Sequence, residues 1–156
     1  MAHVHTALIR WQAGDADFTG KRYSRAHTWT FDGGAVVPAS SSPLVVPLPM
    51  SDAAAVDPEE AFVAALSSCH MLWFLDLAAR AGYAIDSYED AAEGRMGRNA
   101  PGKLVVEVVT LRPRTRVTGA RVPDAASLAA LHHRAHEECF LANSVRCEIR
   151  CEPALE

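Results

Sequence analysis

The sequence has no unbroken apolar run and no surplus of basic residues, and it shows no pattern typical of a signal peptide. Its most apolar region, residues 61–79, is interrupted by Ser67, Ser68, His70 and Asp76, which predicts a buried core helix rather than a membrane span. Lysine and arginine (15) are outnumbered by aspartate and glutamate (19), so the net charge is −4. No basic surplus is left to neutralise phosphates. We therefore expect neither nucleic acid nor a membrane as partner.

Cysteine is scarce as well. Four cysteines in 156 residues are too few to stabilise a fold that depends on many disulfides. The start of the chain alternates loosely and has neither the cationic head nor the apolar run of a signal peptide. We therefore expect a cytoplasmic protein. In a reducing compartment, a pair of cysteines is more often catalytic or metal-binding than structural.

The composition is that of one ordinary globular domain. Apolar residues make up 49% and charged residues 22% of the chain. A length of 156 residues lies close to the commonest domain size. We predict a single domain over residues 1–156.

The pattern of apolar residues predicts an α+β fold with the element order β-β-β-α-β-β-α-β. The expected strands cover residues 3–12, 23–31, 35–37, 85–96, 103–117 and 145–152. The second expected helix covers residues 123–138, and Asp32-Gly33-Gly34 is typical of a hairpin turn.

The first helix has clear signals at both ends. Asp57 is a good N-cap, Pro58 suits the first helical position, and Glu60 completes a capping box. Gly82 is expected to end the helix after Ala81. Because the middle of this helix is apolar on more than one face, we expect it to be central and largely enclosed.

Two cysteines, Cys69 and Cys139, lie far apart in the sequence, each in or at the end of a predicted helix. Cys69 shares an apolar stripe with Phe62 and Trp73. A thiol in such surroundings is inert unless a cation stabilises its thiolate, so Cys69 taken alone is better explained as a packing residue. Two cysteines in matching positions instead favour a paired thiol site.

Glu59 and Glu60 stand at the start of the same helix, where carboxylates also stabilise the helix dipole. Glu59 precedes Cys69 by ten residues, about 15 Å of straight helix. It therefore cannot contact Cys69 along one helix. A shared site would need a long intervening side chain such as arginine, or a Glu59 from a second subunit.

The remaining candidate ligands have simpler explanations. His132 and His136 are four residues apart, and Cys139 could join them at a metal ion, but histidine-rich exposed helix faces are common. Cys147 and Cys151 stand on one face of a predicted strand, about 13 Å apart, which is too far for a direct bridge. Core packing is the better explanation for these two cysteines.

The chain resembles the OsmC/Ohr family of thiol-dependent hydroperoxide reductases. The resemblance rests on Asp-Pro-Glu-Glu-x-Phe-x-Ala-Ala-x-x-Ser-Cys over residues 57–69 and on Cys139-x-x-x-Asn143. The element order agrees, so the likeness covers essentially the whole chain. Two departures point to a distinct subgroup: Phe140 stands where well-studied members have proline, and Cys69 is followed by His70.

The resemblance implies an OsmC-like fold in an intertwined homodimer with sites at the subunit interface. It makes Cys69 the peroxidatic cysteine, Cys139 the resolving cysteine, and Glu59 the partner of an arginine that serves Cys69. Arg25 is the preferred arginine, and Arg22 is the alternative. The implied partners are a hydroperoxide substrate and an external dithiol reductant. No metal, flavin or haem is needed, because sulfur carries the electrons.

The predicted function is a cysteine-based peroxidase that forms a Cys69–Cys139 disulfide. An apolar wall from Phe62, Trp73 and Phe140 is expected to favour organic hydroperoxides over hydrogen peroxide. The first alternative is a non-catalytic protein of the same fold that binds a small molecule or senses redox state. The second is a metal protein that uses Cys69, His70, His136 and Cys139.

Overall fold

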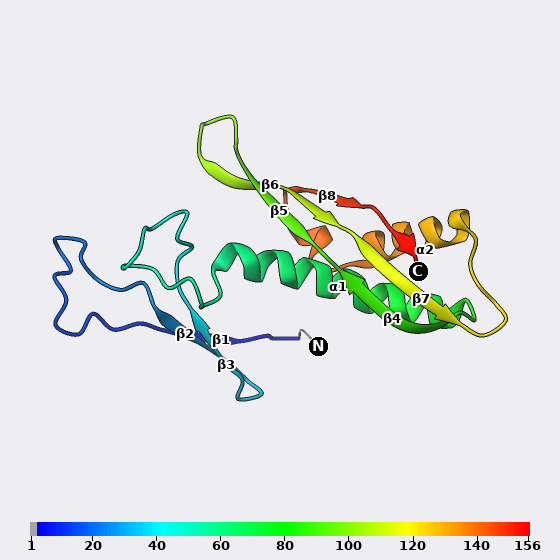
Figure 1. Cartoon of the computed structure of the whole chain (residues 1–156), viewed down its shortest axis with the longest axis horizontal. Helices are drawn as coiled ribbons and strands as arrows, with labels where there is room; N and C mark the ends of the chain where they lie inside the picture. The colour runs from blue at the N-terminus through cyan, green and yellow to red at the C-terminus, as the bar shows by residue number, and fades with distance from the viewer. Residues whose placement is uncertain (1–2) are drawn as a thin grey trace. The chain divides into compact units, whose positions relative to one another are not determined.

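The computed structural model describes residues 3–156 and shows two compact units (Figure 1). The N-terminal unit is Met1–Ala61 and the C-terminal unit is Phe62–Glu156. The long helix α1, Pro58–Arg80, begins in the first unit and supplies most of its length to the second. The element order confirms the predicted α+β class, with two helices and three small sheets.

The N-terminal unit contains one antiparallel sheet in the order β1-β2-β3. Its strands are β1 (Ala7–Arg10), β2 (His27–Phe31) and β3 (Val36–Ala39). The predicted hairpin turn is confirmed: Gly34 has a φ of +87°, and its amide donates to the Phe31 carbonyl at 2.9 Å. Glycine adopts this left-handed conformation at no steric cost, which is why the chain reverses there.

Helix α1 begins and ends where its sequence signals place it. The Glu60 amide donates to Asp57 Oδ1 at 2.8 Å, and the Asp57 amide donates to the Glu60 carboxylate at 3.2 Å. These two bonds form the predicted capping box. Gly82 has a φ of +79° and its amide donates to the Ala79 carbonyl at 3.0 Å, which closes the last turn.

Each of the two long strands predicted between residues 85 and 117 is divided in two. The observed strands are β4 (Ala84–Asp90), β5 (Glu93–Arg98), β6 (Leu104–Leu111) and β7 (Pro113–Thr118). The Arg112 amide donates to Asp90 Oδ1 at 2.6 Å instead of to a neighbouring strand. Pro113 has no amide hydrogen to donate. The long hairpin therefore separates into a β4–β7 ladder and a β5–β6 ladder.

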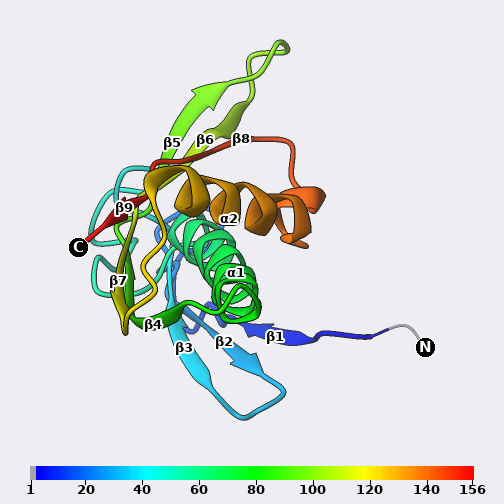
Figure 2. The same ribbon diagram turned by 90° about the vertical axis from the view of Figure 1, so that its right-hand side faces the viewer.

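The C-terminal segment follows the same division. Strand β8 (Glu148–Cys151) adds in parallel to β6, and the short β9 (Ala154–Leu155) adds in parallel to β7. Helix α2, Ala125–Glu138, has Asp124 as N-cap, whose side chain accepts a hydrogen bond from the Ser127 amide at 2.7 Å. A 3₁₀ turn, Ala142–Ser144, follows α2. Figure 2 shows α2 running beside α1.

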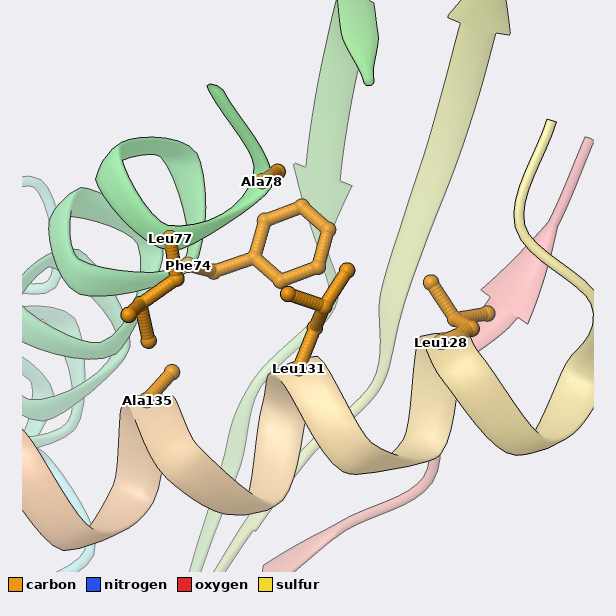
Figure 3. Packing of buried hydrophobic residues seen from close by; sticks show 6 residues of the cluster. All are labelled: Phe74, Leu77, Ala78, Leu128, Leu131 and Ala135. Atoms are coloured by element: carbon orange, nitrogen blue, oxygen red, sulfur yellow. The ribbon is translucent and has the colours of Figure 1, made fainter. Parts of the chain in front are cut away.

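The contact between α1 and α2 forms the main apolar core (Figure 3). The Phe74 ring points from α1 towards Leu131 of α2. The buried residues of this cluster are Phe74, Leu77, Ala78, Leu128, Leu131 and Ala135. A second cluster joins Leu66 to Val109 and Leu111 of β6. The predicted central role of α1 is therefore confirmed.

The predicted enclosure of α1 is only partial within the chain. Its buried residues are Leu66, His70, Phe74, Leu77 and Ala78, which form one face. On another face, Leu72 is 62% exposed. Within residues 3–156, α1 is the one helix whose length and composition would suffice for a membrane span. Its packing against α2 and β6 is that of a core helix.

Candidate active site

The structure brings Cys69 and Cys139 together. Cys69 lies in the middle of α1 and is half-buried, whereas Cys139 is the C-cap of α2 and is 1% exposed. The two thiols lie close enough to influence each other electrostatically, and both are free. Packing of α1 against α2 thus places two thiols close together although they are far apart in the sequence.

The turn after α2 holds Cys139 in place. The Asn143 side-chain amide donates to the carbonyls of Glu137 at 2.7 Å and Cys139 at 3.0 Å. These carbonyls belong to the helix end, where no intrahelical donor remains. The Ala142 amide donates to Cys139 Sγ at 3.4 Å. The Cys139-x-x-x-Asn143 spacing therefore has a structural reason, because Asn143 caps the helix that ends at the thiol.

The surroundings of Cys139 keep it protonated. Burial, reinforced by the neighbouring Cys69 thiol, raises the pKa of the Cys139 thiol to about 11. At neutral pH this thiol is therefore uncharged. Such a group is poorly suited to be the first nucleophile, because the thiolate is the reactive form.

Cys69 and its neighbour His70 belong to different faces of α1. Successive residues of a helix are rotated by about 100°, so adjacent side chains point in different directions. His70 continues the buried face between Leu66 and Phe74. Cys69 instead belongs to a second row of side chains on α1, together with Trp73, Asp76 and Arg80.

That second row borders a pocket of about 330 Å³, within the range usual for small-ligand sites. Its lining residues are Cys69, Leu72, Trp73, Asp76, Arg80 and Phe140. The rings of Trp73 and Phe140 meet edge to face, with centroids 5.5 Å apart. Asp76 and Arg80 form an ion pair at 2.8 Å. A thiol, an aromatic wall and one ion pair therefore share a single pocket.

Two of the three predicted wall residues, Trp73 and Phe140, line this pocket. Phe62 does not line this pocket, because its side chain packs against the core cluster of Leu66. Leu72 also lines the pocket, and the sequence had not pointed to it. It follows Cys69 by three residues, a spacing that places two helical side chains on neighbouring positions of one surface.

Arg25 and Glu59 both lie in the N-terminal unit. Arg25 donates to the Lys21 and Tyr23 carbonyls at 3.2 and 2.5 Å, and its guanidinium lies 3.8 Å from the centroid of the Tyr23 ring. Glu59 is half-buried in the first turn of α1. Within residues 3–156, no ion pair joins Arg25 to Glu59. The alternative arginine, Arg22, pairs with Asp17.

The metal-binding alternative named the wrong set of ligands. The structure groups His70 with His132 and Cys151, and it does not gather Cys69, His70, His136 and Cys139 into one cluster among the residues it describes. Cys151 was expected only to pack. The helical pattern places His70 and His132 on buried faces, but nothing in the sequence shows that those faces meet.

The described residues form an α+β protein with two packed helices and three small sheets. A pair of thiols lies where the two helices meet, which is the arrangement of a two-cysteine redox protein. The chain belongs to the family of OsmC-like proteins, whose family model matches residues 51–154. None of the curated proteins compared with the chain matches it.

Solved structures agree with this assignment. An OsmC-like protein of unknown function from Vibrio cholerae is 51% identical, with a TM-score of 0.95 over 98% of this chain and 100% of that one. The organic hydroperoxide resistance protein OhrB of Bacillus subtilis is 19% identical, with a TM-score of 0.64 over 99% and 98%. An organic hydroperoxide resistance protein from Legionella pneumophila is 14% identical, with a TM-score of 0.66 over 100% and 98%. The last two show a shared fold.

Proposed function

We propose that this protein is a thiol-dependent peroxidase that reduces organic hydroperoxides at Cys69. The observation that carries the proposal is the neighbouring pair of free thiols, Cys69 and Cys139, beside an apolar pocket. The names of the Bacillus subtilis and Legionella pneumophila proteins, both organic hydroperoxide resistance proteins, support the same chemistry. We also propose that the protein is cytoplasmic and that residues 1–156 act as a single functional domain.

The reaction proceeds in two steps at sulfur. The Cys69 thiolate attacks the distal oxygen of the hydroperoxide, the O–O bond breaks, and the alkoxide takes up a proton and leaves as an alcohol. Cys69 is then a sulfenic acid. The Cys139 sulfur next displaces its hydroxyl as water and forms the Cys69–Cys139 disulfide. An external dithiol regenerates both thiols by exchange and is itself oxidised to a disulfide.

Arg25 and Glu59 keep their proposed roles in this scheme. Arg25 would stabilise the Cys69 thiolate and the charge that develops on the leaving oxygen. Glu59 would orient Arg25 through a bidentate ion pair. We further propose that two copies form a homodimer, since a second copy could bring Glu59 to a site that its own helix separates from Cys69 by about 15 Å. The 62% exposure of Leu72 supports a covering second chain.

The wild-type protein should form an intramolecular disulfide after one equivalent of cumene hydroperoxide. Non-reducing mass spectrometry should show a loss of two hydrogens and a peptide that links Cys69 to Cys139. The Cys139→Ser variant should instead gain one oxygen at Cys69, because the resolving thiol is absent. Cys147→Ser is the matched control and should form the disulfide normally. A non-catalytic binding protein would show no stoichiometric oxidation, and oxidation confined to Cys147 or Cys151 would also contradict the proposal.

Phe140 should set the preference for organic substrates. Phe140→Ala removes one side of the aromatic wall, so we expect kcat/KM for cumene hydroperoxide to fall by about tenfold. Hydrogen peroxide has no apolar group to place on this wall, and its kcat/KM should change by less than about twofold. Leu141→Ala, a neighbouring change outside the pocket, serves as control. Equal losses for both peroxides would show that Phe140 supports the site generally and does not select substrates.

A further inference from the structure

A second cluster of reactive side chains lies in the interior of the C-terminal unit. His70 comes from α1, His132 from α2, and Cys151 from the end of β8. The distance from His70 Nε2 to His132 Nδ1 is 3.0 Å, and that from His70 Nε2 to Cys151 Sγ is 3.7 Å. One possible ligand atom from each of the three residues lies within 4.8 Å of the other two. The proposed peroxidase chemistry uses none of them.

These separations resemble the edges of a metal coordination tetrahedron. With zinc–nitrogen bonds of about 2.05 Å and zinc–sulfur bonds of about 2.3 Å, tetrahedral ligands stand about 3.3 Å apart for two nitrogens and about 3.6 Å apart for nitrogen and sulfur. The observed 3.0 and 3.7 Å differ from these values by only a few tenths of an ångström. The third separation, between His132 and Cys151, is bounded only by 4.8 Å, so an ion between the three groups would need these two residues to adjust to the same geometry.

The rings are held in this arrangement by packing. His70 and His132 are each 2% exposed, and their rings are nearly parallel, at 4°. The His132 ring stacks on Phe74 with centroids 4.1 Å apart. Burial lowers the pKa of His70 to about 4 and that of His132 to about 3, so both rings are uncharged at neutral pH. Uncharged imidazole is the form that binds metals.

The protein alone leaves this cluster incompletely satisfied. The Nε2 atom of His132 and the hydroxyl of Tyr88, whose ring lies 6.5 Å from that of His132 between centroids, are buried without a hydrogen-bond partner in the described chain. An unsatisfied buried polar group costs about 1–3 kcal/mol.

Charge at the cluster also favours a cation. Asp90 lies near enough to act electrostatically on both His70 and Cys151. Burial and this carboxylate raise the pKa of the Cys151 thiol to about 12, so an ion would have to displace the thiol proton when it binds. Its oxygens are fixed by the Ser67 hydroxyl at 2.5 Å and the Arg112 amide at 2.6 Å. A divalent ion bound by two neutral imidazoles and one thiolate keeps one positive charge. The Asp90 carboxylate would balance that charge.

The geometry points to a metal site at His70, His132 and Cys151 that binds a divalent transition metal, with Zn²⁺ as the preferred ion. Imidazole and thiolate ligands together suit Zn²⁺ better than Mg²⁺ or Ca²⁺, which prefer oxygen. The ion would connect α1, α2 and β8. Its role is structural, because the proposed reaction takes place at a different pair of sulfurs.

The test is a Co²⁺ titration of the full chain after chelation, in a Cys69→Ser/Cys139→Ser background that leaves only Cys147 and Cys151 as thiols. We expect one Co²⁺ per chain, with a thiolate-to-cobalt charge-transfer band and tetrahedral d–d bands that Zn²⁺ abolishes. Cys151→Ser in that background should lose the charge-transfer band. The matched control Cys147→Ser should keep it.

Thermal unfolding of the wild-type protein gives a second measurement that needs no variant to fold. Zn²⁺ should raise the Tm of the chelated, reduced protein, because an ion that binds only the folded state stabilises it. Absence of both the charge-transfer band and the Tm shift would overturn the proposal. Loss of the band in Cys147→Ser but not in Cys151→Ser would overturn it as well.

Discussion

The Cys69→Ser variant should lose hydroperoxide reduction by about 10³-fold or more, because removal of a catalytic nucleophile abolishes the covalent route. A serine hydroxyl is not ionised at neutral pH, and its oxygen cannot form the equivalent of a sulfenic acid. The measurement is steady-state consumption of cumene hydroperoxide with dithiothreitol as reductant. Circular dichroism of the variant should match that of the wild type, since the substitution is small and Cys69 is only half-buried.

Cys147→Ser makes the same chemical change at a half-buried thiol outside the pocket, where it borders the Leu66 cluster. Its peroxidase activity should stay within about twofold of the wild type. Equal activity in Cys69→Ser and wild-type protein would remove Cys69 from the reaction. Loss of activity in both variants would point to a general structural effect of thiol replacement.

The largest effect on stability is expected for Phe74→Ala. Phe74 is fully buried between α1 and α2, and its ring also stacks on His132. Truncation of a buried phenylalanine costs about 3–5 kcal/mol in free energy of unfolding, a large part of the 5–15 kcal/mol typical of a domain. Denaturation in guanidinium chloride at fixed protein concentration, followed by far-ultraviolet circular dichroism, measures the change.

Leu44→Ala provides the control, because Leu44 is 98% exposed and its truncation should change the free energy of unfolding by less than about 0.5 kcal/mol. A loss below about 1 kcal/mol for Phe74→Ala would mean that the helix contact is not the core of the C-terminal unit. A variant that does not fold at all would agree with the prediction, provided that Leu44→Ala folds normally.

Features specified by neighbouring residues could be predicted from the sequence. The capping box of Asp57 and Glu60, the glycine stop at Gly82 and the hairpin at Gly34 each depend on bonds within a few residues. The division of the long strands could not be predicted in this way. It depends on Asp90, whose carboxylate accepts from Arg112 and from Ser67, both of which are distant from it in the sequence.

The candidate site shows the same limit. Cys69 and Cys139 could be named from their positions in predicted helices and from the family motif. That their side chains lie next to each other depends on how α1 packs against α2. Of the residues predicted to form the wall, Trp73 and Phe140 line the pocket and Phe62 packs against the core, because helix periodicity gives relative directions but not which face meets the core.

The sequence by itself determined the α+β class, the ends of both helices and the two cysteines of the proposed peroxidase, since these depend on local spacing and on the family motif. The tertiary structure alone decided which stripe of α1 enters the core and which borders the pocket. That choice separates the adjacent residues Cys69 and His70, placing one beside Cys139 and the other beside His132 and Cys151. The physical reason is that a helix presents several faces, and only packing against α2 and the sheets selects among them.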